Sequence, residues 1–569
     1  MSFLKSLSLT LFTVFVLVTR LHAAAVPPLR PAANTTLGLA VGSLNGNVAR
    51  YTLPFAQPPV GGLRFANPQP PSKFNGTYDA SSTPPSCYGD ISTRGGNALS
   101  EDCLYFTVYT PTGGSKSKGV LVWLYGGSFI GGSSTAAGLD ASKLAASQDI
   151  VVIVPQYRVG LFGFFQNAAT LDETNGGKPN ATKVAGNQAV RDVVAALGLI
   201  KQNAAAFNGD PNKITIAGQS SGAHIVRTLL TTPAAQSLFA RAAMFSDVQD
   251  YGLSNTTQAA ELTDFALADL GCTTLDCARA SSADDVLSAT FDAFSTLPNV
   301  DPTMPLGEPF RPTLGKYIPR SFERGLAANT LKLTKPLLLS TVQNDAGSQI
   351  GNVFEPTPAG ATTLTLRANG FQVDFPTAAS LIFNAGRGYT AATSKVYGLN
   401  TTTSGQDALR SQLEVLSSDG FWRCSAQYNA VNAKRNGAQV WLAQTNVGAT
   451  YPSNSNIDYC QKPNVVCHED DIYLIFGSYP SSEATTAVKA VSAEWQARLA
   501  AFVNNGNPNT GSYAGWSPVA SATSLNLLVL GSNTATGKSA IRQTQHSSAC
   551  GPSGIWGRSV PFDWQLYHA

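Results

Sequence analysis

The chain reads KITIAGQSSGAHIV from residue 213 to residue 226. A β-branched run leads into the pattern Gly-x-Ser-x-Gly at 218–222, and helical spacing of apolar residues follows. Strand, sharp turn and helix in this order predict a nucleophile elbow, in which the central Ser220 is strained and its hydroxyl stands clear of the backbone. The small residues Gly218 and Gly222 allow the strand and the helix to pack closely.

Further apolar, β-branched segments surround this elbow. They predict strands over 37–41, 48–53, 104–110, 119–125, 151–154, 335–342 and 438–443. Residues 187–203 have helical spacing, and residues 208–211 are predicted to turn into the elbow strand. Alternating strands and helices favour an α/β fold with a mostly parallel central sheet and helices on both faces.

Two longer blocks, 247–331 and 361–434, are mainly helical in pattern. We interpret them as large helical insertions between sheet strands. Because no linker is long enough to split the chain, residues 26–569 are predicted to form one domain.

Composition limits the class of protein. Hydrophobic residues make up 43% of the chain and charged residues only 13%, so a large core can form and a disordered protein is excluded. The net charge of +3 is spread without runs of lysine or arginine, which argues against nucleic acid as a partner.

Residues 1–25 predict a secretory signal peptide. They contain Lys5, an apolar run over 7–18 and small residues at 23–25. The run is too short to span a membrane, no later stretch could span one, and the C-terminus lacks the apolar tail of a GPI signal. We therefore expect a secreted, extracellular protein without a stable membrane anchor.

Export predicts disulfides, and the cysteines form an even set without metal-site spacing to histidines. They are Cys87, Cys103, Cys272, Cys277, Cys424, Cys460, Cys467 and Cys550. Five Asn-x-Ser/Thr sequons are candidates for glycosylation. They are Asn34, Asn75, Asn180, Asn255 and Asn400.

A serine hydroxyl needs a base within hydrogen-bond reach. Of the five histidines, His22 leaves with the leader and two others lie in the C-terminal tail. His224 lies one helical turn beyond Ser220, where its side chain runs along the helix, so a packing role is expected. His468, in a loop before an apolar helix start, is the candidate base.

An oxyanion hole needs backbone N–H groups directed at the developing charge. Residues 122–132, VWLYGGSFIGG, form a glycine-rich loop after a predicted strand. This loop precedes the elbow by two strands, and we predict that it supplies these donors.

Three further motifs occur in order along the chain: PPVGGLRF at 58–65, SEDCLYFTV at 100–108 and YRVG at 157–160. Together with the elbow they resemble the type-B carboxylesterase/lipase family, which includes cholinesterases and fungal secreted lipases. The resemblance runs from about residue 52 to residue 556. It implies an α/β-hydrolase fold and a serine esterase that needs no metal or cofactor.

The resemblance assigns roles to particular residues. It implies Ser220 as nucleophile and His468 as base, with N–H donors from Gly127, Ser128 and Ser221. Ser128 replaces a usual glycine, but a backbone donor survives this change if the loop tolerates a Cβ atom.

The acid departs from the family pattern. The family places a glutamate where this chain has Ala346, and Asp345, one position earlier, is the only carboxylate in that turn. We predict Asp345 as the triad acid if the loop shifts, with Glu355 as the alternative. Gln219 also stands where a glutamate is usual, which removes a charge beside the nucleophile.

The family further implies the bridges Cys87–Cys103, Cys272–Cys277 and Cys424–Cys550, which leaves Cys460–Cys467. A Cys424–Cys467 pairing stays open at this point.

These residues predict a carboxylesterase acting on small-molecule or lipid esters through an acyl-enzyme. The alternatives are an interfacial triglyceride lipase and a non-catalytic binding or adhesion protein on the same fold. The short polar loop between Cys87 and Cys103 favours soluble esters over triglyceride, and its lack of tryptophan disfavours choline esters. The candidate lining of an acyl pocket is aromatic, although core packing is expected for most of it: Trp123, Phe129, Phe164, Phe165 and Trp422. The sequence does not indicate the oligomeric state.

Overall fold

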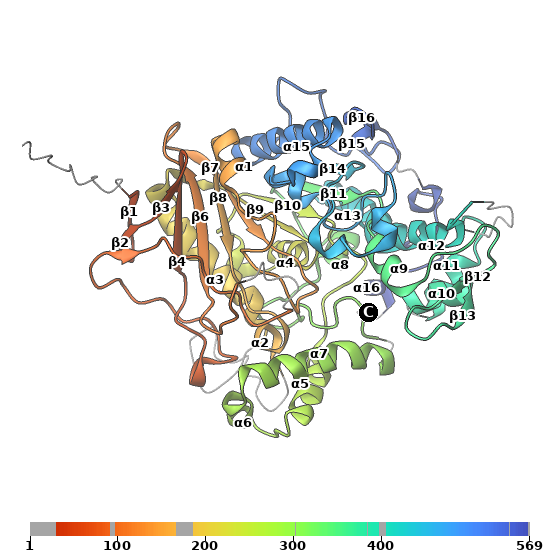
Figure 1. The fold of residues 1–569 in the computed structure, drawn as a ribbon, viewed down its shortest axis with the longest axis horizontal. Helices are drawn as coiled ribbons and strands as arrows, with labels where there is room; N and C mark the ends of the chain where they lie inside the picture. Colours follow the sequence, from red (N-terminus) through yellow and green to blue (C-terminus); the bar gives the residue numbers. More distant parts are fainter. Residues whose placement is uncertain are drawn as a thin grey trace, which may run out of the picture.

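The computed structural model describes residues 30–90, 97–166, 186–301, 303–383, 385–397, 405–544 and 547–566. An 11-stranded sheet runs through its centre in the order β16-β15-β14-β11-β10-β9-β7-β8-β6-β4-β3 (Figure 1). The strands are β3 (Ser43–Asn45), β4 (Val48–Pro54), β6 (Tyr105–Pro111), β7 (Lys118–Leu124), β8 (Val151–Pro155), β9 (Gly209–Gln219), β10 (Arg241–Phe245), β11 (Leu337–Val342), β14 (Val440–Thr445), β15 (Leu527–Asn533) and β16 (Lys538–Arg542). All neighbours from β8 to β15 pair in parallel, whereas both edges are antiparallel.

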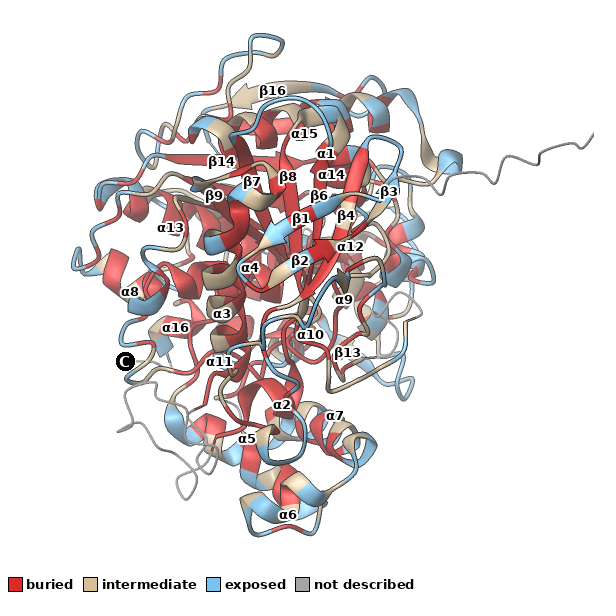
Figure 2. Cartoon of the chain, turned by 90° about the vertical axis from the view of Figure 1, so that its left-hand side faces the viewer, coloured by how far each residue is buried: buried red, intermediate tan, exposed pale blue. Residues whose placement is uncertain are grey.

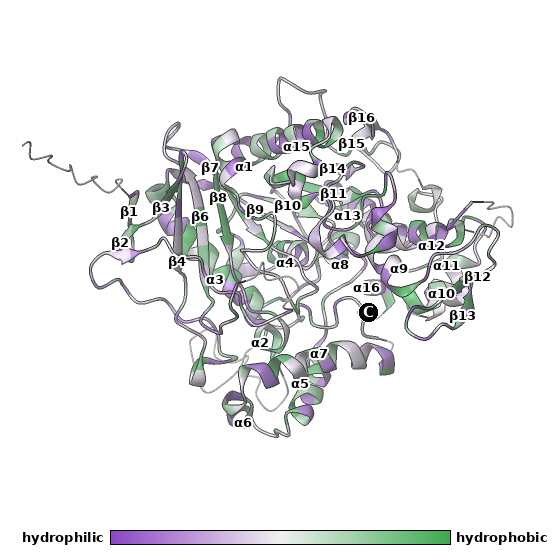
Figure 3. Cartoon of the chain, viewed as in Figure 1, coloured by the Kyte–Doolittle hydropathy of each residue, from purple (hydrophilic) through white to green (hydrophobic). Residues whose placement is uncertain are grey.

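The central strands form because their sequences suit burial on both faces. β7 and β8 are buried along their whole length and are rich in valine, isoleucine and leucine. Parallel strands covered on both faces read as such continuous apolar runs. The buried colour of Figure 2 and the hydrophobic colour of β8 in Figure 3 show that this region is the main core.

Helices cover the sheet from both sides (Figure 1). On one side α1 (Ser142–Gln148), α14 (Ile472–Phe476) and α15 (Thr486–Asn505) pack against one another. On the other side lie α3 (Gln188–Asn203), α4 (Ser221–Leu229) and α13 (Cys424–Arg435). This arrangement confirms the predicted α/β fold with a mostly parallel sheet.

Two helical insertions interrupt the strands. The first, between β10 and β11, contains α5 (Thr256–Asp269), α6 (Leu275–Ala280), α7 (Ala283–Val300) and α8 (Phe322–Ala327). The second, between β11 and β14, contains α9 (Gly347–Val353), β12 (Thr363–Thr365), β13 (Gln372–Asp374), α10 (Phe375–Ile382), α11 (Ala385–Ala392), α12 (Ala408–Ser418) and α13. Because β10 pairs with β11 and β11 with β14, each insertion leaves and rejoins the sheet at neighbouring strands.

The remaining elements are small. A three-stranded sheet contains β1 (Ala32–Thr35), β2 (Gly38–Val41) and β5 (Tyr78–Asp79), and two short helices are α2 (Gly160–Phe164) and α16 (Asp563–Leu566). Within the described ranges, no helix combines the length and apolarity that a membrane span requires.

The predicted turn at 208–211 is wrong for most of its length. β9 already begins at Gly209, which pairs with Lys118 across a shift in register. Asn208 alone makes the turn, with φ of 63°. A shift of this kind accommodates Pro211, whose nitrogen cannot donate to a regular ladder.

Four disulfides are present: Cys87–Cys103, Cys272–Cys277, Cys424–Cys550 and Cys460–Cys467. All eight cysteines are therefore paired, and the structure does not contain the open Cys424–Cys467 alternative. The bridge at Cys467 lies directly beside His468.

The sequons differ in accessibility. Asn34 and Asn75 are exposed, and Asn255 is half-buried because it caps α5. Asn180, Asn400 and the predicted leader at 1–25 lie outside the described residues.

Candidate active site

Ser220 lies at the junction of β9 and α4 with φ of 56° and ψ of −129°. Such a positive φ is unusual for a residue with a Cβ atom and marks a strained turn. The turn depends on its glycines: a Cβ atom at Gly218 would lie 2.5 Å from the carbonyl carbon of Gly222, and one at Gly222 would strike the carbonyl oxygen of Leu124. The predicted elbow geometry is therefore present.

The candidate base and the candidate acid are in contact. His468 Nδ1 lies 2.9 Å from Asp345 Oδ1, and Asp345 Oδ2 accepts a 2.9 Å hydrogen bond from the N–H of Val342. Both carboxylate oxygens are thus used, and the side chain of Asp345 is fully buried. Glu355, the alternative acid, instead pairs with Arg367 at 2.8 Å.

Asp345 reaches the imidazole because the acid loop and the base loop are paired. The N–H of Asn344 donates to the carbonyl of Val466 at 2.9 Å, and the N–H of Val466 donates to Asn344 Oδ1 at 3.2 Å. Asn344 Nδ2 also donates to Glu414 Oε2 at 2.9 Å. These hydrogen bonds bring Asp345 to His468, although its side chain is shorter than that of the usual glutamate and starts one position earlier in the chain.

A second set of bonds holds the loop of the base. Asn454 Nδ2 donates to the carbonyl of His468 at 2.7 Å and to Asp470 Oδ1 at 2.9 Å. Asp470 Oδ2 accepts from the N–H of Cys467 at 2.8 Å, and Cys467 is bridged to Cys460. The backbone on both sides of the imidazole is therefore fixed.

Opposing effects act on the pKa of His468. Burial lowers it, while the hydrogen bond and the charge of Asp345, with the charges of Glu469 and Asp471, raise it, and the net effect is a pKa above the ordinary 6.5. The side chain keeps 17% of its surface exposed, so solvent still reaches one edge of the ring. A base with a pKa near the working pH suits general acid–base catalysis.

The other ring nitrogen of His468 faces the elbow. Nε2 lies 3.0 Å from Nε2 of Gln219, the residue before the candidate nucleophile. In the described part of the chain no hydrogen bond joins the Ser220 hydroxyl to His468. Catalytic hydrogen bonds are often long without substrate and shorten when it binds.

The predicted oxyanion loop lies against the elbow. A Cβ atom at Gly126 would lie 2.8 Å from Cβ of Ser220, so the two segments are in close contact. Gly127 and Ser128 both have positive φ, 127° and 52°, and Ser128 thus adopts a conformation usual for glycine. Ser221 opens α4, where the first N–H groups of a helix have no partner within it.

His224 lies in a different environment from His468. It is fully buried, and its Nδ1 lies 2.8 Å from Glu308 Oε2. Burial, with the charges of Arg227 and Arg311, lowers the pKa of His224 well below its usual value. Burial and the charge of Asp247 raise the pKa of Glu308 to about 8. Both shifts favour the neutral forms of the two side chains. No sequence motif indicated Glu308.

The candidate aromatic residues divide into two groups. Trp123 packs against Phe245 and Phe476, and Phe165 stacks on Phe65, so these two serve the core. The others lie closer to the site: Phe129 is in the oxyanion loop and contacts Phe164 and His224, and the ring of Trp422 lies 5.5 Å from that of His468.

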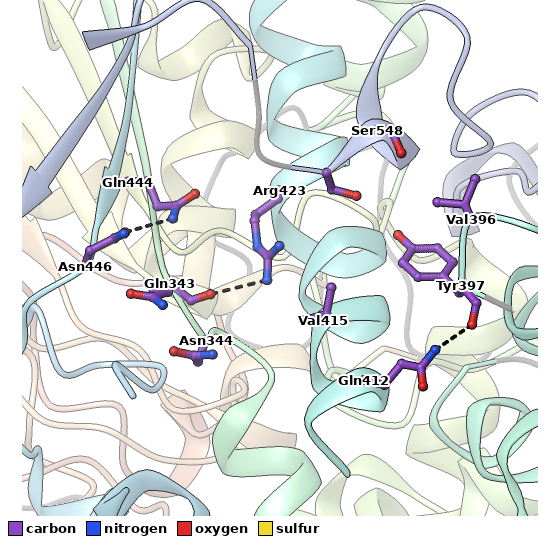
Figure 4. Close-up of a pocket in the computed structure, with 11 residues that line it drawn as sticks. Gln343, Asn344, Val396, Tyr397, Gln412, Val415, Arg423, Gln444, Asn446 and Ser548 are labelled. Carbon is purple, nitrogen blue, oxygen red and sulfur yellow. Dashed lines mark hydrogen bonds between the residues drawn. The ribbon is translucent and has the colours of Figure 1, made fainter. Parts of the chain in front are cut away.

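A polar pocket of about 470 Å³ lies beside the acid loop (Figure 4). Its described lining includes Gln343 and Asn344, Gln444 from β14, and Arg423, whose guanidinium donates to the carbonyl of Gln343. Neither Ser220 nor His468 lines it, so the pocket is separate from the predicted point of reaction. Asp419 pairs with Arg423 at 2.7 Å, which leaves the pocket without a free cation among its described groups.

Sheet order, elbow and the acid–base pair together define an α/β hydrolase. Solved structures agree: the chain matches a PNB esterase with a TM-score of 0.70 at 25% identity, covering 90% of this chain and 97% of that one. A thermophilic PNB esterase matches with a TM-score of 0.71 at the same identity.

The chain belongs to the carboxylesterase family, whose model matches residues 32–549. Mouse carboxylesterase 1D is 29% identical over 86% of this chain and 88% of its own length. The para-nitrobenzyl esterase of Bacillus subtilis is 28% identical over 84% and 90%, respectively. Human cocaine esterase is 36% identical, but the match covers only 40% of its length.

Proposed function

We propose that the protein is a secreted serine hydrolase that cleaves carboxylic esters through an acyl-enzyme on Ser220. The 2.9 Å contact between His468 and Asp345 is the observation on which this proposal depends most. An imidazole oriented by a buried carboxylate, placed at a strained serine elbow, is the arrangement that activates a serine. Membership of the carboxylesterase family supports ester substrates.

In the proposed cycle the Oγ of Ser220 attacks the ester carbonyl while His468 Nε2 accepts its proton. The N–H groups of Gly127, Ser128 and Ser221 stabilise the oxyanion. The C–O bond to the alcohol breaks, and the imidazolium returns the proton to the leaving oxygen. A water then gives a proton to His468 and attacks the acyl carbonyl. The bond between the acyl carbon and Oγ breaks, His468 returns the proton to Oγ, and the carboxylic acid leaves with Ser220 and neutral His468 restored.

Two observations support secretion. All eight cysteines are paired, as in proteins of oxidising compartments. The sequons Asn34 and Asn75 are exposed, as glycosylation requires.

Contact between Asp345 and His468 also weighs against a non-catalytic binding protein, because a carboxylate orients the imidazole although the family glutamate is missing. Whether long-chain esters at an interface are preferred is a separate question. Rates on short and long nitrophenyl esters, below and above their solubility limits, distinguish an esterase from an interfacial lipase.

The direct test is fluorophosphonate labelling of the purified, disulfide-intact protein and of Ser220→Ala. We expect the parent to be labelled at residue 220 and to lose esterase activity in proportion. Ser220→Ala should not be labelled, and its kcat should fall by about 10⁶-fold. An unlabelled parent that is folded by circular dichroism would refute the proposal.

A further inference from the structure

The side chain of Gln219 contacts the reactive face of the candidate base. Gln219 ends β9, is fully buried, and places its Nε2 3.0 Å from Nε2 of His468. Its other polar atom, Oε1, is also buried and has no hydrogen-bond partner within the described ranges. Half of the carboxamide is thus engaged with the imidazole while the other half is unused.

The bond to Asp345 determines which amide atom can face the ring. Because Nδ1–H of His468 donates to Asp345, the neutral imidazole presents a lone pair at Nε2. Only the NH₂ group of Gln219 can donate to that lone pair. The same lone pair has to accept the proton of Ser220, so Gln219 and Ser220 share one acceptor.

Transfer of a proton to Nε2 of His468 reverses the hydrogen-bonding requirement of this atom. Once Nε2 carries a proton, it becomes a donor and needs an acceptor, which the NH₂ group cannot be. The terminal torsion of glutamine is broad and roughly two-fold, so a half-turn presents Oε1 with little cost in torsional energy. Oε1 is the atom without a partner in the resting arrangement.

We propose that Gln219 is a positioning residue for His468, donating to Nε2 through its NH₂ group in the resting enzyme and accepting from Nε2–H through Oε1 in the imidazolium state. This inference rests on the function proposed above. A carboxamide can donate to the neutral ring and accept from the imidazolium. A carboxylate can only accept from the imidazolium, and the thioether of methionine has no hydrogen to donate to the neutral ring.

The charges around the His468 ring determine how a substitution at position 219 changes the pKa of the imidazole. Asp345 and Glu308 face His468 from other segments, and Glu469 and Asp471 from its own. All four are acidic, and burial raises the pKa of Glu308, Glu469 and Asp471 and so favours their protonated forms. A fully ionised carboxylate at position 219 would therefore add to a negative surrounding and favour the imidazolium.

The test compares the pH dependence of kcat/KM on a soluble short-chain nitrophenyl ester for the parent, Gln219→Glu and Gln219→Met. Gln219→Glu has nearly the same size and shape, so the fold should be retained. We expect its acidic limb to move upward by about one pH unit, which is about tenfold less activity on that limb and near-parent activity at high pH. Gln219→Met should lose about tenfold in kcat at every pH, because both bonds to Nε2 are lost.

A matched control is Gln444→Glu. Gln444 is also buried at the carboxyl end of a parallel strand, but its Nε2 donates to Asn446 at 2.8 Å and not to a histidine (Figure 4). Its acidic limb should stay within a few tenths of a pH unit of the parent.

Superimposable profiles for Gln219→Glu and the parent would overturn the inference, as would parent kcat in Gln219→Met. The proposed function fails separately, if Ser220→Ala keeps its activity. An inactive Ser220→Ala with unaltered Gln219 variants would therefore refute the role of Gln219 alone.

Discussion

Ser220 and His468 belong to two regions of the molecule that are held in different ways. The nucleophile region consists of β9, the loop at 126–132 and the start of α4, and its geometry depends on backbone dihedrals and on glycines that admit no Cβ atom. The base region consists of the turn after β11 and the loop at 460–471, and it depends on side-chain hydrogen bonds, buried acids and a disulfide. Backbone geometry does not titrate and cannot be reduced. The base region should therefore be the part that responds to pH and to redox conditions.

The largest effect is expected from the acid. Asp345→Asn can present its NH₂ group to Nδ1 and thereby stabilise the wrong tautomer of His468, so kcat should fall by about 10⁴-fold. The melting temperature should change little, because the Val342 N–H can still bond to the amide oxygen. Steady-state kinetics with calorimetry provide the measurement. An Asn variant within tenfold of the parent would show that the base does not depend on its acid.

A smaller loss is expected from the disulfide beside the base. Replacing Cys460 and Cys467 by serine should lower kcat/KM by about 10²-fold, because small displacements of a catalytic group are costly. The control is the matching double variant of Cys272 and Cys277, which closes a similarly short loop, with a separation of 5 residues against 7. Chain entropy predicts similar losses of stability for both variants. Equal activity in the two would remove the special role of the Cys460–Cys467 bridge.

In the nucleophile region the sharpest probe is Gly126→Ala. The added methyl would lie 2.8 Å from Cβ of Ser220, so the oxyanion loop must move off the elbow, and we expect about tenfold lower kcat. Gly198→Ala, in α3, is the control, since its Cβ would meet nothing within 4 Å. That variant should keep full activity and gain about 0.5–1 kcal/mol of stability. If Gly126→Ala had the same kcat as the parent, the loop could move away from the elbow without loss of activity.

The smallest effect concerns stability and pH. Burial raises the pKa of Glu308 to about 8 and of Asp470 and Asp471 to about 7, above the ordinary carboxyl values of an unfolded chain. At these three acids the folded state binds more protons than the unfolded state between about pH 4 and 8, and the raised pKa of His468 acts in the same direction. His224 acts in the opposite direction below its ordinary pKa of 6.5, because burial lowers its pKa in the folded state. Stability should therefore rise as the pH falls from 8 to about 6.5.

Activity should change in the opposite direction. The proposed reaction needs neutral His468, so kcat/KM should fall as the pH drops below the raised pKa of this residue. Melting temperatures and rates measured in the same buffers test both trends. A melting temperature that falls as the pH is lowered from 8 to about 6.5 would contradict the assignment of these buried acids.

The sequence predicted those parts of the site that depend on neighbouring residues, and it did not predict every contact between residues far apart in the chain. The elbow is local, since five consecutive residues with a strand before them and a helix after them suffice to indicate it. Asp345 was also predicted, but its reach depends on the bonds between Asn344 and Val466, which are more than 100 residues apart in the chain. The contact between Gln219 and His468 spans 249 residues, and no local pattern could indicate it.

The prediction of secondary structure was limited in the same way, because pairing between distant segments decides where some strands form. β10 was not predicted because RAAMF at 241–245 has no β-branched residue, and it becomes a strand through its position between β9 and β11. Likewise, Gly209 joins β9 through its pairing with Lys118, although its neighbours Asn208 and Asp210 favour a turn.

The return of each insertion to an adjacent strand has a consequence for engineering. Because β10, β11 and β14 run parallel, each segment leaves at the carboxyl end of one strand and re-enters at the amino end of the next, so its two ends lie at opposite edges of the sheet. The second segment also contains Asp345, so exchanging it as a whole would remove the candidate acid. The first segment, between β10 and β11, is therefore the better place for chimeras that seek new substrate ranges.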